Sequence, residues 1–80
     1  MTVVTLYGKP GCHLCEDARR AVTAARADRD FELREIDVSS DPELHGRYGE
    51  RIPVLAVDDQ ELFQYHVDAG ALREALDRAS

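Results

Sequence analysis

The sequence predicts an α/β fold, a four-stranded mixed sheet with helices on both faces and the element order βαβ-α-ββ-α. Two observations predict it. Short runs of β-branched and aromatic residues alternate with segments whose apolar residues recur at the spacing of one helix face. Glycine and proline lie between these segments, where turns and element ends are expected. A helix between the first two strands requires them to be parallel, whereas the last two strands form a hairpin.

The first strand is predicted over residues 2–7, because this run is short and rich in valine, threonine and tyrosine. Residues 8–11 follow as a loop that contains two glycines and a proline. From Cys12 onward the pattern takes the period of a helix. Its expected buried face consists of Leu14, Ala18, Ala21, Val22 and Ala25.

The second strand is predicted over residues 31–38, where apolar and polar residues alternate. A helix start follows it, with Ser40 or Asp41 as the cap and Pro42 in the first turn. Glycines over residues 46–49 end this short helix.

The third strand is predicted over residues 54–57 and the fourth over residues 61–67, joined by a turn at Asp58 and Asp59. The last helix opens at Asp68. Its expected buried face consists of Leu72, Ala75, Leu76 and Ala79.

Length and composition limit the classes of protein. Eighty residues suffice for one domain over residues 1–80, and no run approaches the roughly 18 apolar residues of a membrane span. The start of the chain lacks the basic and apolar regions of a signal peptide, so we expect a cytoplasmic protein. A net charge of −6 argues against nucleic acid as a partner.

Both cysteines of the chain lie at the start of the first predicted helix, as a Cys12-His-Leu-Cys15 motif. A disulfide between them would close a very small loop and would therefore add little to the stability of the fold. A structural zinc site normally has four ligands in recognisable pairs, and this sequence has no second pair of cysteines. We therefore predict redox chemistry and no metal site.

The position of Cys12 suits a nucleophile. Unpaired backbone N–H groups at a helix start, together with the nearby Lys9, favour the thiolate, which is the reactive form of cysteine. Cys15 follows one helical turn later and faces Cys12. The Cys12 thiolate is expected to attack a disulfide, and Cys15 to resolve the mixed disulfide. His13, between them, is expected to tune this chemistry.

The segment Val4-Thr-Leu-Tyr-Gly-Lys-Pro-Gly-Cys-His-Leu-Cys15 resembles the opening of glutaredoxins, and Ile52-Pro53-Val54 resembles the segment that lies opposite their cysteines. The Cys-His-Leu-Cys form looks most like the small bacterial glutaredoxin-like proteins. The resemblance implies a minimal thioredoxin-like fold and a cis Ile52–Pro53 bond. It also implies that the Ile52 backbone pairs with a peptide-like substrate.

The resemblance further implies roles for Lys9, which would stabilise the thiolate or pair with a carboxylate of glutathione, and for Asp68, which equally suits a helix cap. The predicted substrate-binding residues are Lys9, His13, Ile52, Pro53 and Asp68. Two departures concern glutathione. His13-Leu14 replaces the proline–aromatic pair of glutaredoxins, and residues 65–68 lack their glycine pair.

The sequence therefore predicts a monomeric thiol–disulfide oxidoreductase that needs no resident cofactor. Its expected partners are disulfide-containing proteins or glutathione and a reductase system, with glutathione left open as the electron donor. One alternative is a thioredoxin-fold carrier that uses the cysteines for a metal or iron–sulfur cluster. Another is an interaction domain in which the two cysteines have no chemical role.

Overall fold

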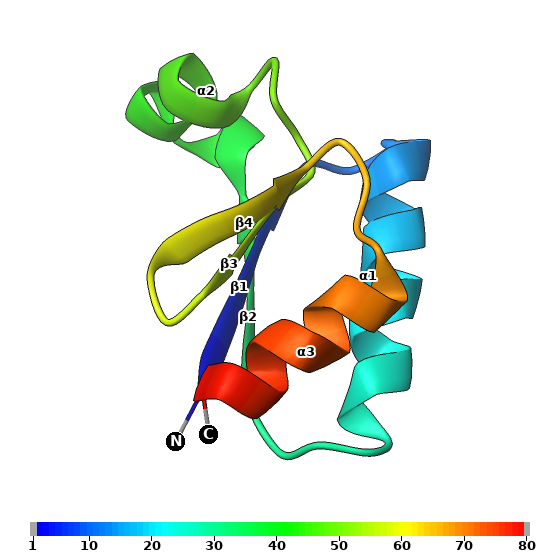
Figure 1. Cartoon of the computed structure of the whole chain (residues 1–80). Coiled ribbons are helices and arrows are strands. Elements are labelled where there is room, and N and C mark those ends of the chain that lie inside the picture. The colour runs from blue at the N-terminus through cyan, green and yellow to red at the C-terminus, as the bar shows by residue number, and fades with distance from the viewer. Residues whose placement is uncertain (1, 80) are drawn as a thin grey trace.

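In the computed structural model, which describes residues 2–79, four strands form one mixed sheet in the order β2–β1–β3–β4 (Figure 1). β1 (Val3–Gly8) pairs in parallel with β2 (Glu32–Asp37). β3 (Val54–Val57) is antiparallel to β1, and β4 (Gln60–Gln64) is antiparallel to β3. The predicted fold class and element order are thus confirmed.

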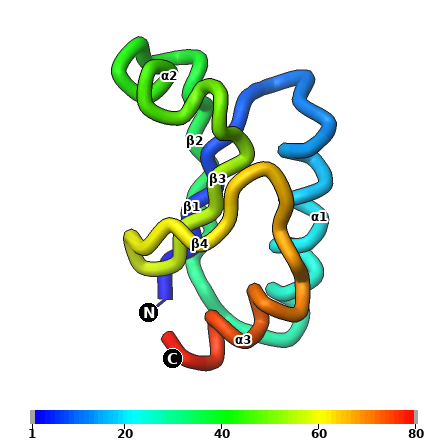
Figure 2. Tube along the Cα trace, turned by 45° about the horizontal axis from the view of Figure 1, so that its top comes forward, coloured from blue at the N-terminus to red at the C-terminus, as the bar shows by residue number. Residues whose placement is uncertain are grey.

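The helices lie on opposite sides of the sheet. α1 (His13–Arg26) and α3 (Ala69–Ala79) pack together on one face (Figures 1 and 2). A 3₁₀ turn, Val38–Ser40, leads from β2 into α2 (Pro42–Tyr48), which lies on the other side near the carboxyl end of β1. Asp41 caps α2, because its side chain accepts the N–H groups of Glu43 and Leu44.

The main core lies between the sheet and the helices α1 and α3. Alternate residues of the central strands, such as Leu6 in β1 and Leu55 in β3, point to this face. Leu55 and Leu72 are fully buried, and burial of each stabilises the fold by about 1.5–3 kcal/mol. The buried members are Val4, Leu6, Ala18, Val22, Ala25, Phe31, Leu55, Val57, Val67, Leu72 and Leu76.

A second cluster of buried residues lies at the carboxyl end of β1. It joins the start of α1, the end of α2 and the segment that enters β3. Its buried members are Cys15, Val38, Tyr48, Ile52 and Val54, and Tyr7, Cys12 and Leu44 pack against them. The two cysteines are therefore anchored in an apolar cluster separate from the main core.

Two predicted core residues are exposed. Leu14 was expected on the buried face of α1, but 49% of its surface is accessible, whereas Cys15 is buried. Adjacent helical residues point about 100° apart, so a stripe centred on Cys15 and Ala18 turns Leu14 outward. In α3, Ala79 is likewise exposed rather than buried, while the other three predicted members of its face are buried.

The fourth strand is shorter than predicted. It ends at Gln64 rather than Val67, because Tyr65 has a φ of 68° and turns the chain away from β3. The hairpin turn before β4 is confirmed. Asp58 and Asp59 have φ values of 49° and 69°, the pair of positive angles that a two-residue hairpin turn of type I′ requires.

None of the helices formed within residues 2–79 has the length and apolar character needed to cross a membrane.

Candidate active site

Cys12 is the cap of helix α1. It has an extended backbone, with φ −95° and ψ 114°, and its Sγ accepts the backbone N–H of Cys15 at 3.2 Å. A sulfur in this position receives one of the N–H groups that a helix start leaves unpaired, which favours a negative charge on it. The Cys12 side chain is partly exposed, so a substrate can reach it.

Cys15 lies one turn further along α1 and is buried, with 8% of its surface accessible. The pKa of Cys15 is raised to about 11, chiefly by burial. The hydrogen bond between its thiol and Cys12 and the negative charge of Cys12 raise the pKa as well. The backbone N–H and the charge of Lys9 act in the opposite direction. Cys15 is thus a protonated, shielded thiol beside an accessible one.

The end of β1 passes very close to Cys15. A Cβ built on Gly8 would lie 3.0 Å from the Cys15 sulfur and 3.2 Å from its Cβ. Only a residue without a side chain leaves the sulfur its present position. The sequence places Gly8 in a predicted loop and does not signal this contact, which depends on how α1 packs against β1.

The Ile52–Pro53 peptide bond is cis, as the resemblance implied. Pro53 is fully buried, and Ile52 belongs to the same apolar cluster as both cysteines. Within residues 2–79, no hydrogen bond engages the backbone N–H or C=O of Ile52. The structure therefore brings together Cys12, Cys15 and the Ile52–Pro53 segment.

Two aromatic residues, one in β1 and one at the end of α2, support this arrangement. Tyr7 and Tyr48 stack with ring centroids 4.3 Å apart and an angle of 21° between the ring planes. The Tyr48 hydroxyl donates to Glu61 Oε2 at 3.1 Å, and Arg51 Nη2 donates to Glu61 Oε1 at 2.6 Å. Burial and the bond to Glu61 raise the pKa of Tyr48. These contacts hold the end of α2 to β1 and β4.

Tyr65 was also missed. Its backbone N–H donates to Pro53 O at 2.9 Å, and its hydroxyl donates to Glu50 O at 3.1 Å. No sequence pattern signals this role, because by its residue type Tyr65 is an ordinary strand aromatic.

The other predicted site residues, Lys9, His13 and Asp68, are exposed. Lys9 lies in the loop before Cys12, and His13 is the first residue of α1. Asp68 lies at the start of α3, where its Oδ1 accepts the N–H of Ala71 at 2.9 Å. That bond is a helix cap, the second of the two roles expected for this residue.

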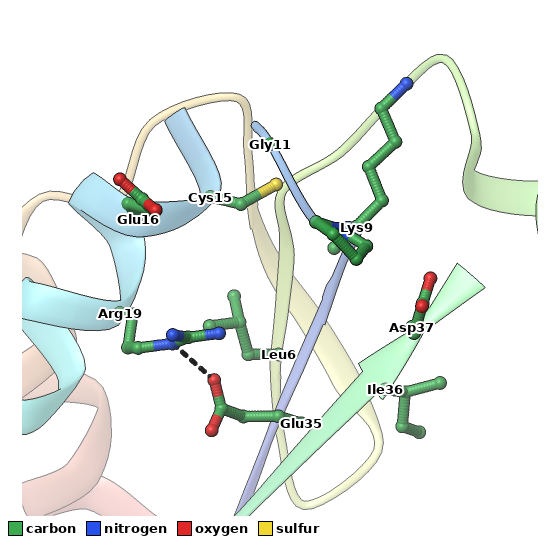
Figure 3. Close-up of a pocket in the computed structure, with 11 residues that line it drawn as sticks. Leu6, Lys9, Gly11, Cys15, Glu16, Arg19, Glu35, Ile36 and Asp37 are labelled. Atoms are coloured by element: carbon green, nitrogen blue, oxygen red, sulfur yellow. Dashed lines mark ion pairs between the residues drawn. The ribbon is translucent and has the colours of Figure 1, made fainter. Parts of the chain in front are cut away.

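An open cleft of about 440 Å³ lies between the first half of α1 and the carboxyl-terminal ends of β1 and β2 (Figure 3). Cys15 contributes to its wall, but neither Cys12 nor Pro53 does. An ion pair between Arg19 Nε and Glu35 Oε1, 2.5 Å long, spans it. The lining residues are Leu6, Gly8, Lys9, Pro10, Gly11, Cys15, Glu16, Arg19, Glu35, Ile36 and Asp37.

The part of the chain that the structure describes holds no group of three or more histidine, cysteine or acidic side chains arranged to bind a metal ion. Within residues 2–79, the two cysteines thus have no histidine, cysteine or acidic neighbour that would form a group of three metal ligands with them. Their arrangement suits an exchange between two thiols and an external disulfide.

Comparison with known proteins agrees with this geometry. A model of the glutaredoxin-like domain family (DUF836) matches residues 3–77. The structure of target protein XcR50 from X. campestris is 36% identical, with a TM-score of 0.76, over 96% of this chain and 99% of that one. Protein Ne2328 from Nitrosomonas europaea is 31% identical, with a TM-score of 0.80, over 94% and 91%.

A thioredoxin variant from Halobacterium salinarum NRC-1 is similar in fold alone, with 22% identity and a TM-score of 0.72 over 96% of this chain and 73% of that one. The fold is therefore thioredoxin-like. The family match spans all elements of the sheet and its helices, including the cysteine pair and the cis proline. This chain belongs to the glutaredoxin-like domain family.

Proposed function

We propose that this chain is a thiol–disulfide oxidoreductase in which Cys12 is the nucleophile and Cys15 the resolving thiol. One observation carries the proposal. An accessible sulfur caps helix α1 and accepts the N–H of Cys15, while the second thiol is buried directly behind it. This arrangement separates the two roles, because only the first sulfur can meet a bulky substrate.

In the first step the Cys12 thiolate attacks one sulfur of a substrate disulfide. A bond forms between Cys12 Sγ and that sulfur, the substrate S–S bond breaks, and the other substrate sulfur leaves as a thiolate. The N–H of Cys15 stabilises the charge on Cys12 before the attack. The product is a mixed disulfide in which Cys12 carries no charge.

In the second step Cys15 attacks Cys12 Sγ, which releases the remaining substrate half as a thiolate and leaves a Cys12–Cys15 disulfide. The proton of Cys15 passes to the departing substrate thiolate. Of the causes that raise the pKa of Cys15, the negative charge of Cys12 is lost in the mixed disulfide. We therefore expect Cys15 to ionise more readily at the stage where its thiolate is needed. The substrate gains two electrons and the dithiol loses them.

The backbone of Ile52, which has no hydrogen-bond partner within residues 2–79, is the proposed contact for the substrate chain, as an added strand beside the cis proline. The oxidised cysteine pair then needs a thiol donor, either a small thiol such as glutathione or a dithiol reductase protein. Reduction of the oxidised chain by glutathione with its reductase, and separately by thioredoxin reductase, distinguishes these donors.

Two cysteine variants test the mechanism. Reduced wild-type chain, Cys12→Ser and Cys15→Ser are each mixed with bis(2-hydroxyethyl) disulfide, and intact masses are recorded after acid quenching. We expect wild-type chain to lose two hydrogens, Cys15→Ser to accumulate the mixed disulfide, and Cys12→Ser to remain unmodified. Because the two variants differ only in which sulfur is removed, each serves as the control for the other.

Circular dichroism of both variants shows whether they keep the fold. Equal adduct formation on folded Cys12→Ser and Cys15→Ser chains, or wild-type chain that stays reduced, contradicts the proposed roles.

A further inference from the structure

Tyr65 has a backbone conformation that tyrosine rarely adopts. Its φ is 68°, and the N–H of His66 donates to Gln64 O at 2.8 Å, which closes a three-residue turn around Tyr65. Turns of this kind with a positive central φ are rare and strained, and glycine is the residue that adopts them without a steric penalty. A strained residue persists only where the surrounding structure compensates for its cost, and such residues cluster at functional sites.

Two hydrogen bonds compensate for the strain, and both reach the segment that carries the cis proline. The N–H of Tyr65 binds Pro53 O, and its hydroxyl binds Glu50 O. The two acceptors lie on either side of Ile52 in the sequence, and the backbone of Ile52 is itself unpaired within residues 2–79. Tyr65 thus connects β4 to both flanks of the proposed substrate contact.

Tyr65 remains accessible even though its hydroxyl is bonded. It exposes 47% of its surface, and of the large hydrophobic residues in the described chain only Leu14 is similarly exposed. The connection from β4 to α3 passes between the loop that follows α2 and the start of α1 (Figures 1 and 2). An aromatic face with its polar group already satisfied can contact a neighbouring side chain at little further cost.

We propose that Tyr65 is a specificity residue that favours polypeptide disulfides over small-molecule disulfides. This inference rests on the proposed oxidoreductase function. A polypeptide that pairs with the backbone of Ile52 places a residue next to its cysteine against the Tyr65 ring. A small disulfide reaches the Cys12 sulfur but has no residue to place there.

The test compares two disulfides in single-turnover reactions, so that no electron donor is required. Reduced chain is mixed with insulin or with bis(2-hydroxyethyl) disulfide, and oxidation of the cysteine pair is followed by alkylation and mass spectrometry. The readout is the ratio of the two second-order rate constants, insulin over the small disulfide. Tyr65→Gly is expected to lower this ratio roughly fivefold to tenfold, from the contribution of one aromatic contact.

Asp59→Gly is the matched control. Asp59 has a φ of 69°, almost the same as Tyr65, but lies in the hairpin turn between β3 and β4. The Asp59→Gly variant therefore shows the effect of relaxing a positive φ without removing the Tyr65 ring. We expect its ratio of the two rate constants to equal that of the wild-type protein. Tyr65→Phe keeps the ring and loses the bond to Glu50, and we expect it to stay within about twofold of wild-type chain.

Each outcome decides the inference. A ratio unchanged in Tyr65→Gly, or lowered equally in Asp59→Gly, overturns the role of Tyr65 while the oxidoreductase function stands. Wild-type chain that reduces neither disulfide overturns both. If Tyr65→Gly does not fold, Tyr65→Asn replaces it, because asparagine also tolerates a positive φ and lacks the aromatic ring.

Discussion

Gly8 lies so close to Cys15 that any side chain at position 8 would require the Cys15 sulfur to shift. A Cβ there would lie 3.0 Å from the Cys15 sulfur. The last residue of β1 and the first turn of α1 therefore set the position of the resolving thiol together. The reactivity of the cysteine pair therefore depends on Gly8, which has no reactive group of its own.

Gly8→Ala is expected to lower the free energy of unfolding by about 1 kcal/mol, because the added methyl group overpacks the space beside Cys15. It should also slow the second step of disulfide reduction, since the displaced sulfur no longer lies behind Cys12. Urea unfolding measures the first effect, and decay of the mixed disulfide measures the second.

The double variant Gly8→Ala/Cys15→Ala provides the control for stability. Removal of the sulfur relieves the shorter of the two contacts and keeps the one to the Cys15 Cβ, so Gly8→Ala should cost less stability in the Cys15→Ala background than in the wild-type protein. Equal costs in the two backgrounds would mean that the contact with the sulfur does not limit position 8.

Stability is expected to fall at alkaline pH because of Cys15. Burial raises the pKa of Cys15 from 9.0 to about 11 in the folded chain. Between these pH values the unfolded chain has released the proton and the folded chain still holds it, so rising pH favours unfolding. The contribution is complete below about pH 9 and is lost toward pH 11, with a slope of at most about 1.4 kcal/mol per pH unit.

Urea unfolding of reduced wild-type chain and of Cys15→Ala, from pH 8 to pH 10.5, measures this contribution. Tyrosine titrations are common to both chains and cancel in the difference. We expect wild-type chain to lose about 2 kcal/mol relative to Cys15→Ala over this range. A difference that stays constant with pH would contradict the raised pKa.

Tyr48→Phe is expected to lower the free energy of unfolding by about 1 kcal/mol, because it removes the bond to Glu61 but keeps the stacking on Tyr7. Tyr48→Ala, which also removes the stacking and leaves a cavity, should cost about 3–5 kcal/mol. Thermal or urea unfolding measures both. In a Glu61→Ala background the Tyr48→Phe change should become nearly neutral, and a full cost there would argue against the hydrogen bond.

Asp68→Ala is expected to lower the free energy of unfolding by about 1 kcal/mol, since it removes the cap of α3. Asp68→Asn keeps an oxygen that can accept the N–H of Ala71 and should be close to wild type. Rates of oxidation by glutathione disulfide distinguish the cap from a substrate contact. If Asp68→Asn stays stable but reacts several-fold more slowly, Asp68 also contacts the substrate.

Hydrophobic patterns, together with helix-start and turn residues, predicted the order and type of the four strands and the three α-helices, but not the 3₁₀ turn Val38–Ser40. β3, for example, was predicted over the residues it occupies, because an apolar run bounded by Pro53 and Asp58 has few alternatives. The predictions that were wrong concern the burial of one residue or the end of one element, each of which depends on a single residue. Leu14 lies at the edge of the α1 stripe, and β4 ends early because Tyr65 adopts a positive φ. Hydrophobic periodicity does not report either feature.

The fold class, the family resemblance and the choice of Cys12 and Cys15 as the candidate redox pair followed from the sequence, because these depend on local patterns and on residue spacing. Tertiary structure alone decided which sulfur is accessible, that Gly8 touches Cys15, and that Tyr65 spans from β4 to Glu50. These relationships join residues that are distant along the chain, or turn neighbours to different sides. Burial and distance fix them, and neither is a property of a residue type.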